Sequence, residues 1–173
     1  MNFKKFIIFI IFLLFSSSVI ADEASDWLKK EIDIILNAYK NENLPNENRF
    51  LMVEQTINNN FAGAGIAKFV SGKAWDKANK EVKKEYIKLF KRHLALNIAS
   101  MMQGYSDQTY TLTNSDYDEN SKVYLIDMNI RSETNTLQVV WRLKKAKERL
   151  FVIDLLVADI SLVVTKRSEF NSM

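Results

Sequence analysis

The hydrophobic pattern of this chain changes its period once, near Gln108, and this change limits the possible folds more than any other feature. Before Gln108, apolar residues recur every three or four positions, which is typical of amphipathic helices. After it they alternate with polar residues, which is typical of strands with one buried face. Short polar segments separate the strands, and connections of this length favour antiparallel hairpins. We therefore predict an α+β fold, in which helices pack on a curved antiparallel sheet of about four strands.

The first half of the chain contains most of the expected helices. Apolar spacing predicts helices over residues 27–39, 50–57 and 80–102, with short helical turns between residues 63 and 75. Asn79 is expected to cap the longest helix, because an asparagine side chain accepts hydrogen bonds from the first free amide groups. Gly104 is expected to end that helix, because glycine readily adopts the left-handed conformation found there. A last helix is predicted to begin at Ser161 or Leu162.

The second half contains four segments of period two. They begin near Tyr110, Tyr124, Leu137 and Phe151. The fourth segment is apolar on both faces except at Asp154, so the strand it predicts needs cover on both sides.

Residues 1–21 have the layout of a secretory signal peptide. Lys4 and Lys5 supply a positive start, an apolar run over residues 6–15 follows, and Ala21 suits the cleavage site. A membrane anchor is the alternative, but a spanning helix needs about 20 apolar residues. We expect one mature domain over residues 22–173, located in the periplasm.

The composition excludes several classes of function. The chain has no cysteine, and therefore no disulfide, thiolate metal site or cysteine nucleophile. Without Lys4 and Lys5 the basic residues fall from 24 to 22 against 21 acidic ones, which leaves no basic excess for binding nucleic acid. The glycines between residues 63 and 72 match no phosphate-binding motif.

Few residues could support catalysis. His93 is the only histidine, and its place near the apolar side of the long helix favours a structural role. Asp127 and Asp154 each interrupt an apolar strand, so a general base acting on a small apolar substrate stays an alternative. The preferred interpretation is that Asp127 faces solvent, whereas Asp154 caps or pairs with a neighbouring group. We expect no enzymatic activity, no metal and no cofactor.

A pocket for apolar ligands is the better-supported hypothesis. The inward faces of the strands and of the long helix are rich in apolar residues, and methionines supply deformable side chains. Periodicity does not distinguish a hollow core from a filled one, so a purely structural or chaperone-like domain stays open as well. The expected pocket residues are Phe69, Val70, Trp75, Phe90, Leu94, Ile98, Met101, Met102, Tyr124, Ile126, Met128, Val139, Trp141, Leu143, Ile153 and Leu155.

Three stretches of the sequence resemble proteins of the MlaC family. Residues 61–112 carry a Gly-x-x-Trp turn and a helix that leads to a Tyr-Ser pair, residues 139–143 read Val-Val-Trp-Arg-Leu, and residues 152–173 are the most specific. The matching positions are Gly72, Trp75, Tyr86, Phe90, Leu94, Tyr105, Ser106, Asp154, Ser161, Leu162, Arg167, Ser168, Glu169 and Phe170. On this basis Tyr105 and Arg167 join the expected pocket residues.

The resemblance implies a cone-like fold, similar to nuclear transport factors, with a strongly curved sheet around a deep apolar pocket. It implies a monomeric periplasmic phospholipid-binding protein that is an auxiliary component of an ABC transporter. Such a protein passes lipid between an outer-membrane lipoprotein–porin complex and an inner-membrane transporter with a mammalian-cell-entry domain. The implied role is to maintain the lipid asymmetry of the outer membrane. The headgroup is expected at the pocket mouth, because burying an unpaired phosphate is costly.

The chain departs from the family pattern at its end. Family members usually continue past the helix that carries Arg167, whereas this sequence ends three residues after Phe170. Two alternatives stay open, namely a truncated sequence and a short variant of the family.

Overall fold

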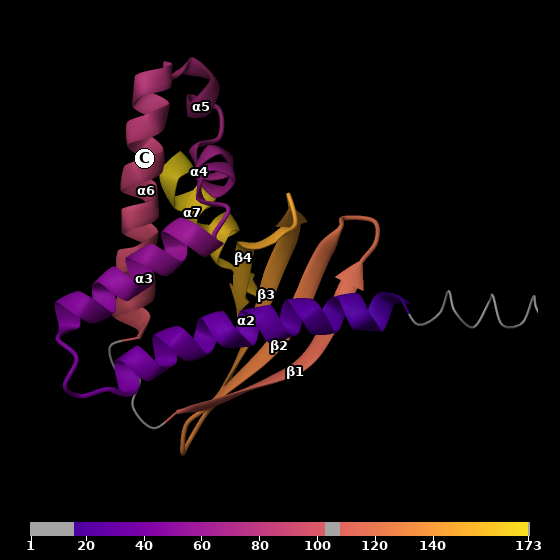
Figure 1. Ribbon diagram of the computed structural model, residues 1–173. Helices are drawn as coiled ribbons and strands as arrows, with labels where there is room; N and C mark the ends of the chain where they lie inside the picture. The colour runs from indigo at the N-terminus through magenta and orange to yellow at the C-terminus, as the bar shows by residue number, and fades with distance from the viewer. Residues whose placement is uncertain (1–15, 103–107, 173) are drawn as a thin grey trace, which may run out of the picture.

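The computed structural model describes residues 16–102 and 108–172 of the 173-residue chain. Six helices and five strands follow one another in this part of the chain (Figure 1). In order they are α2 (Ser16–Lys40), α3 (Asn46–Asn60), α4 (Gly63–Ser71), α5 (Ala74–Lys77), α6 (Lys80–Met101), β1 (Thr109–Asp118), β2 (Val123–Arg131), β3 (Thr136–Ala146), β4 (Arg149–Val157), β5 (Ile160–Ser161) and α7 (Leu162–Asn171). The predicted α+β class is therefore confirmed.

The strands form one antiparallel sheet in the order β1-β2-β3-β4-β5, so each strand pairs with the next one along the chain. The sequence predicts about four strands, and the fifth, β5, has only two residues. Ala158 and Asp159 connect β4 to β5 with φ angles of 47° and 63°. Two successive positive φ angles are typical of a tight hairpin turn, which explains how so short a strand returns to the sheet edge.

Two β-bulges interrupt the register of the sheet. In β1 the pairing shifts between Leu112 and Asn114, and in β4 Val152 pairs with Leu143 while Asp154 pairs with Arg142. One residue in each bulged strand thus has no partner across the sheet. If odd-numbered residues face inward on one side of the bulge, even-numbered residues face inward on the other side. Bulges of this kind bend and twist a strand, and they help to curve the sheet.

The helices cover the sheet unequally. Figure 1 shows α2 lying across one face of the sheet, where it packs on β1 and β2. The long helix α6 stands beside the sheet and packs on α3 and α4, whereas α7 packs on α4 and β4. No helix in the described ranges has the length and apolar character needed to cross a membrane.

The two predicted helix starts are confirmed. The Asn79 side chain accepts a hydrogen bond from the Val82 amide at 2.9 Å, which caps α6 as predicted. The Ser161 hydroxyl accepts one from the Val164 amide at 3.1 Å and caps α7. Gly104, which is predicted to end the long helix, lies outside the described residues.

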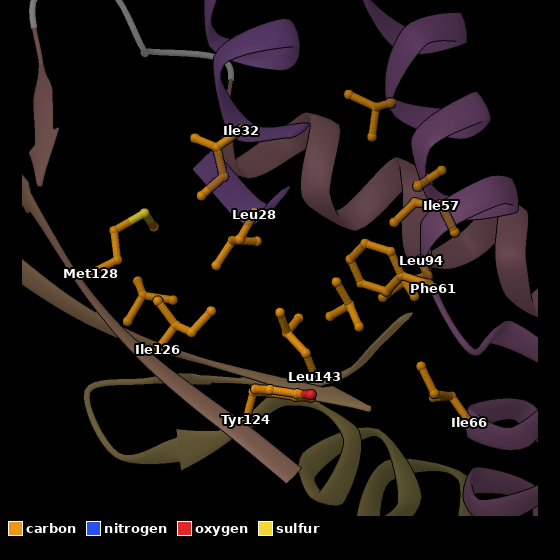
Figure 2. Packing of buried hydrophobic residues seen from close by; sticks show 14 of the residues in the cluster. Leu28, Ile32, Ile57, Phe61, Ile66, Leu94, Tyr124, Ile126, Met128 and Leu143 are labelled. Atoms are coloured by element: carbon orange, nitrogen blue, oxygen red, sulfur yellow. The ribbon is translucent and has the colours of Figure 1, made fainter. Parts of the chain in front are cut away.

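The core lies between the inner face of the sheet and the helices above it. Leu28, Ile57, Ile126 and Leu143 are almost completely buried there. Figure 2 shows these side chains pointing into one shared interior from α2, α3, β2 and β3. The helical half and the strand half of the chain therefore stabilise each other through a common core.

An apolar cavity between the sheet and two helices

A cavity of about 520 Å³ lies between the inner face of the sheet and helices α2 and α3. The end of α6 and the start of α7 complete its wall. The lining residues are Trp27, Leu28, Glu31, Ile32, Ile35, Leu36, Val53, Thr56, Ile57, Asn60, Phe61, Ile98, Met101, Met102, Gln108, Tyr110, Met128, Ile130, Ser132, Asn135, Leu137, Val139, Trp141, Val152, Leu155, Val157 and Leu162.

The sheet wall consists of side chains that follow the strand register. Ile130 pairs with Leu137, Met128 with Val139, and Trp141 with Leu155. Residues paired across antiparallel strands project to the same face, so each pair adds one layer to the cavity wall. The cavity is therefore built on regular sheet structure, which fixes its lining more firmly than loops would.

The opposite wall comes from one face of α2. Trp27, Leu28, Ile32 and Ile35 recur at helical spacing and line the cavity together. Tyr110 of β1 also lines the cavity, and its hydroxyl donates a hydrogen bond to Asp33 on α2 at 2.5 Å. This bond ties helix to sheet beside the cavity.

Asp33 also accepts a hydrogen bond from Lys29 at 2.7 Å. The Lys29 ammonium, followed by the Tyr110 hydroxyl, lowers the pKa of the Asp33 carboxyl below its ordinary value of 3.8. Both donors favour the charged form of Asp33, so the contact between α2 and β1 depends on its ionisation.

The cavity wall carries few polar groups, and they gather in two places. Glu31 of α2 accepts a hydrogen bond from the Asn60 amide of α3 at 2.6 Å, and Thr56 lies one helical turn before Asn60. Gln108, Ser132 and Asn135 lie where β1 begins and where β2 turns into β3. Glu31 is the only charged residue among those that line the cavity in the described part of the chain.

The structure places part of the predicted pocket on the cavity wall. The predicted residues that line it come from the end of α6 and from β2, β3 and β4. They are Ile98, Met101, Met102, Met128, Val139, Trp141 and Leu155.

Several other predicted pocket residues fill the packed core instead. Tyr124, Ile126 and Leu143 are buried on the inner face of the sheet and do not line the cavity. Phe90 and Leu94 are buried on α6, which packs on α3 and α4 away from the sheet. The predicted buried face of this helix is confirmed, but that face packs on other helices and not on the sheet.

Four predicted residues lie near α4 and α7. Val70 is fully buried in the core, and the Phe69 ring packs under the Arg167 guanidinium, with 4.4 Å between the ring centroid and Cζ. Trp75 borders a separate cleft of about 160 Å³ beside α6 and α7. None of these four lines the main cavity within the described residues. Tyr105 lies outside the residues that the structure describes.

The bulge in β4 explains the position of Ile153. Strict alternation counted back from Leu155 places Ile153 on the inner face, and the sequence prediction follows that count. Ile153 is instead the extra residue of the bulge, and Val152 takes the place on the cavity wall. A single inserted residue thus shifts the face of every residue before it.

The wall formed by α2 and α3 was missing from the predicted pocket. The helical pattern of residues 27–39 is plain in the sequence, but periodicity shows only that a face is apolar. It does not show whether that face meets a packed core or a cavity. Phe61 was also missed, and it joins the wall because it forms an isolated parallel bridge with Val152.

None of the candidate catalytic residues lines the cavity in the described part of the chain. Asp154 is buried, accepts hydrogen bonds from the Ser161 hydroxyl at 2.6 Å and the Val163 amide at 3.2 Å, and pairs with Arg142 at 3.5 Å. The predicted structural role of Asp154 is thereby confirmed. His93 is exposed on α6 beside Asn97. Asp127 is half-exposed and lies on strand β2 between two inward-facing residues, so it projects to the outer face. No group of three or more possible metal ligands occurs within residues 16–102 and 108–172.

The fold and the cavity define an α+β protein in which a curved antiparallel sheet and its helices surround an apolar, ligand-sized space. The family described as MlaC protein matches residues 29–173. The chain therefore belongs to the MlaC family, and the predicted resemblance is confirmed.

A solved structure from Ralstonia solanacearum has a similar fold, with a TM-score of 0.71 over 84% of this chain and 83% of that one. That protein is described as a phospholipid-binding protein in complex with a phospholipid. The two sequences are 15% identical, so the likeness is one of fold. No curated protein matches this sequence.

Proposed function

We propose that this protein binds a phospholipid with its acyl chains in the cavity and carries it across the periplasm. The observation that supports this most directly is a cavity of about 520 Å³ whose lining is almost entirely apolar. Membership of the MlaC family and the phospholipid-binding neighbour of the same fold support the choice of ligand. Cleavage of the leader after Ala21 would leave every lining residue in the mature chain, because they begin at Trp27.

The energetics of the proposed complex favour the acyl chains as the buried part. Each buried methylene contributes about 0.8 kcal/mol, so a chain of about 15 methylenes gains on the order of 12 kcal/mol before ordering costs. Two chains need a volume near the upper end of the roughly 300–1,000 Å³ that is common for ligand sites. A cavity of about 520 Å³ lies in the middle of that range. A two-chain lipid therefore requires α2 to shift away from the sheet, or one chain to lie near the mouth.

We further propose that the lipid moves between an outer-membrane lipoprotein–porin complex and an inner-membrane ABC transporter with a mammalian-cell-entry domain. Binding of this strength reverses only slowly in water, because leaving the cavity exposes the chains again. Release must then be coupled to docking on a partner that opens the cavity or competes for the lipid.

Native mass spectrometry of the full chain, purified from cells without detergent, tests the proposed ligand. We expect a stoichiometric phospholipid with the wild type. Val139→Phe places a ring in the cavity and should reduce lipid occupancy about ten-fold, because overpacking costs about 1–3 kcal/mol. Val164→Phe is the matched control, since Val164 is 53% exposed on α7 and does not line the cavity. A folded wild type that carries no lipid and takes none from vesicles would contradict the proposal.

A further inference from the structure

The single charge on the cavity wall interacts differently with different phospholipid headgroups. Glu31 carries the wall's one charge within the described residues, and no lysine, arginine or histidine lines the cavity there. Every phospholipid headgroup contains a phosphate, which a carboxylate repels. Only some headgroups also carry an ammonium group, which a carboxylate attracts.

The carboxylate of Glu31 is held in a fixed place. Its Oε2 atom accepts the 2.6 Å hydrogen bond from Asn60, which joins α2 to α3 across the cavity wall. Among the described residues no cation forms an ion pair with Glu31, so its charge is not neutralised locally. The pair is half-buried, where water screens a charge less than it does on the open surface.

Thr56 extends this polar site. It precedes Asn60 by one helical turn on α3, and both residues line the cavity together with Glu31. An ammonium group has three donors and no acceptor, so it needs several oxygen atoms that converge on it. The Glu31 carboxylate and the Thr56 hydroxyl supply such oxygens between α2 and α3.

We infer that Glu31 is a specificity-determining residue, which receives the ammonium group of an aminophospholipid and disfavours lipids whose headgroups are only anionic. The inference rests on the proposed function and refines it, because lipid carriers that bury only acyl chains discriminate headgroups poorly. A half-exposed ion pair contributes about 0.2–1 kcal/mol. The expected preference is therefore about 1.4- to five-fold.

The test offers the full chain vesicles of phosphatidylethanolamine and phosphatidylglycerol in equal amounts, with matched acyl chains. The protein is then re-isolated, and the two bound lipids are quantified by mass spectrometry. We expect an ethanolamine-to-glycerol ratio that falls about 1.4- to five-fold in Glu31→Gln and falls further in Glu31→Lys. Asp26→Asn is the matched control, because it removes the same charge from an exposed position of α2 that does not line the cavity.

The outcomes separate the inference from the proposed function. An unchanged ratio in Glu31→Gln and Glu31→Lys, with total bound lipid intact, overturns the inference and leaves the proposed function standing. A wild type that binds neither lipid overturns both. If the Glu31 variants do not fold, the unaltered protein is given phosphatidylethanolamine in competition with its N-acetylated form, which lacks the ammonium charge. Preference for the charged form supports the inference, and equal binding overturns it.

Discussion

Asp154 joins three segments of the chain through one buried carboxylate. It is 4% exposed and accepts hydrogen bonds from Ser161 and Val163 at the turn into α7, while Arg142 of β3 lies 3.5 Å away. Removing the carboxylate leaves the Ser161 hydroxyl, the Val163 amide and the Arg142 guanidinium without their shared partner. We expect Asp154→Ala to reduce the free energy of unfolding by about 2–4 kcal/mol, measured by urea denaturation.

Asp127→Ala is the control for this substitution. Asp127 lies on the outer face of the same sheet and is half-exposed, so its loss should change stability by no more than about 0.5 kcal/mol. Equal stability of the two variants would show that Asp154 does not hold α7 on the sheet.

Some features of individual residues can be predicted from the sequence, and others cannot. The caps at Asn79 and Ser161 were predictable, because capping depends on one side chain and the amides that follow it within a few residues. The bulge at Ile153 was not, because it depends on which residue of β3 opposes β4. A pairing across the sheet leaves no local pattern, so the inward faces of Val152 and Ile153 were exchanged in the prediction.

At the scale of elements, α2 is tied to the sheet by a charged hydrogen bond. The pKa of Asp33 is lowered by Lys29 and then by Tyr110. A carboxyl whose pKa is depressed in the folded state stabilises the fold above its unfolded pKa, and this contribution is lost as pH falls through the folded value. Stability from this tie is thus present at neutral pH and lost in acid.

Tyr110→Phe tests the tie between α2 and β1. The pKa of Asp33 should rise toward its ordinary value of 3.8, although Lys29 still keeps it below. The free energy of unfolding at neutral pH should fall by about 0.5 kcal/mol, because the bond is only partly buried and water screens it. Carbon-detected NMR titration between about pH 2 and pH 6 measures the pKa.

Asp118 is the internal reference in that titration. Its pKa is lowered by the Ser121 hydroxyl and by backbone amides of its own turn, far along the chain from Asp33. Its titration should be the same in wild type and Tyr110→Phe. A shift at Asp118 alone, with Asp33 unchanged, would contradict the assignment of the tie to Tyr110.

The elements themselves were largely predictable, whereas their neighbours were not. The spacing of residues 27–39 and 80–102 revealed both long helices. Each of these helices has an apolar face, yet α6 packs on α3 and α4, whereas α2 covers the sheet. Only the last turn of α6 reaches the cavity, through Ile98, Met101 and Met102. Only the tertiary arrangement shows which of the two helices lines the cavity, because amphipathicity identifies the buried face of a helix but not what that face packs against.

At the scale of the whole molecule, the tryptophans report on the cavity. Trp27 and Trp141 line it, whereas Trp75 borders the separate cleft beside α6 and α7. A phospholipid with brominated acyl chains quenches tryptophan fluorescence at contact range. If the acyl chains occupy the cavity, a variant that keeps only Trp141 should be strongly quenched, by roughly half or more of its emission, since an indole on the wall lies against the chain.

The matched variant keeps only Trp75, with Trp27 and Trp141 replaced by phenylalanine. Its emission should change little with the same brominated lipid, because Trp75 is separated from the cavity by the packed helices. Equal quenching of the two variants would mean that the lipid binds outside the cavity or at several places.

The fold class followed from one change of hydrophobic period, and the family from a few motif positions. The presence of a cavity in the core could not be predicted from the sequence. Met128 and Ile126 have the same spacing in β2 and the same apolar character, yet one lines the cavity and the other is packed. The cross-strand partners of both residues, Trp141 and Val139, line the cavity, so the strand pattern does not separate the two. The difference depends on what packs over each side chain, which is a property of the assembled molecule.

The methionines of the cavity wall expose the protein to oxidants. Met101, Met102 and Met128 line the cavity, and Met101 is 61% exposed. Oxidation of a thioether to a sulfoxide replaces a soft apolar group with a polar and chiral one. On this wall the new oxygen would have to be desolvated whenever an acyl chain lies against it. The side chains that let the cavity adapt to lipid are thus the ones through which oxidative damage would weaken its hold, and their enzymatic reduction would restore it.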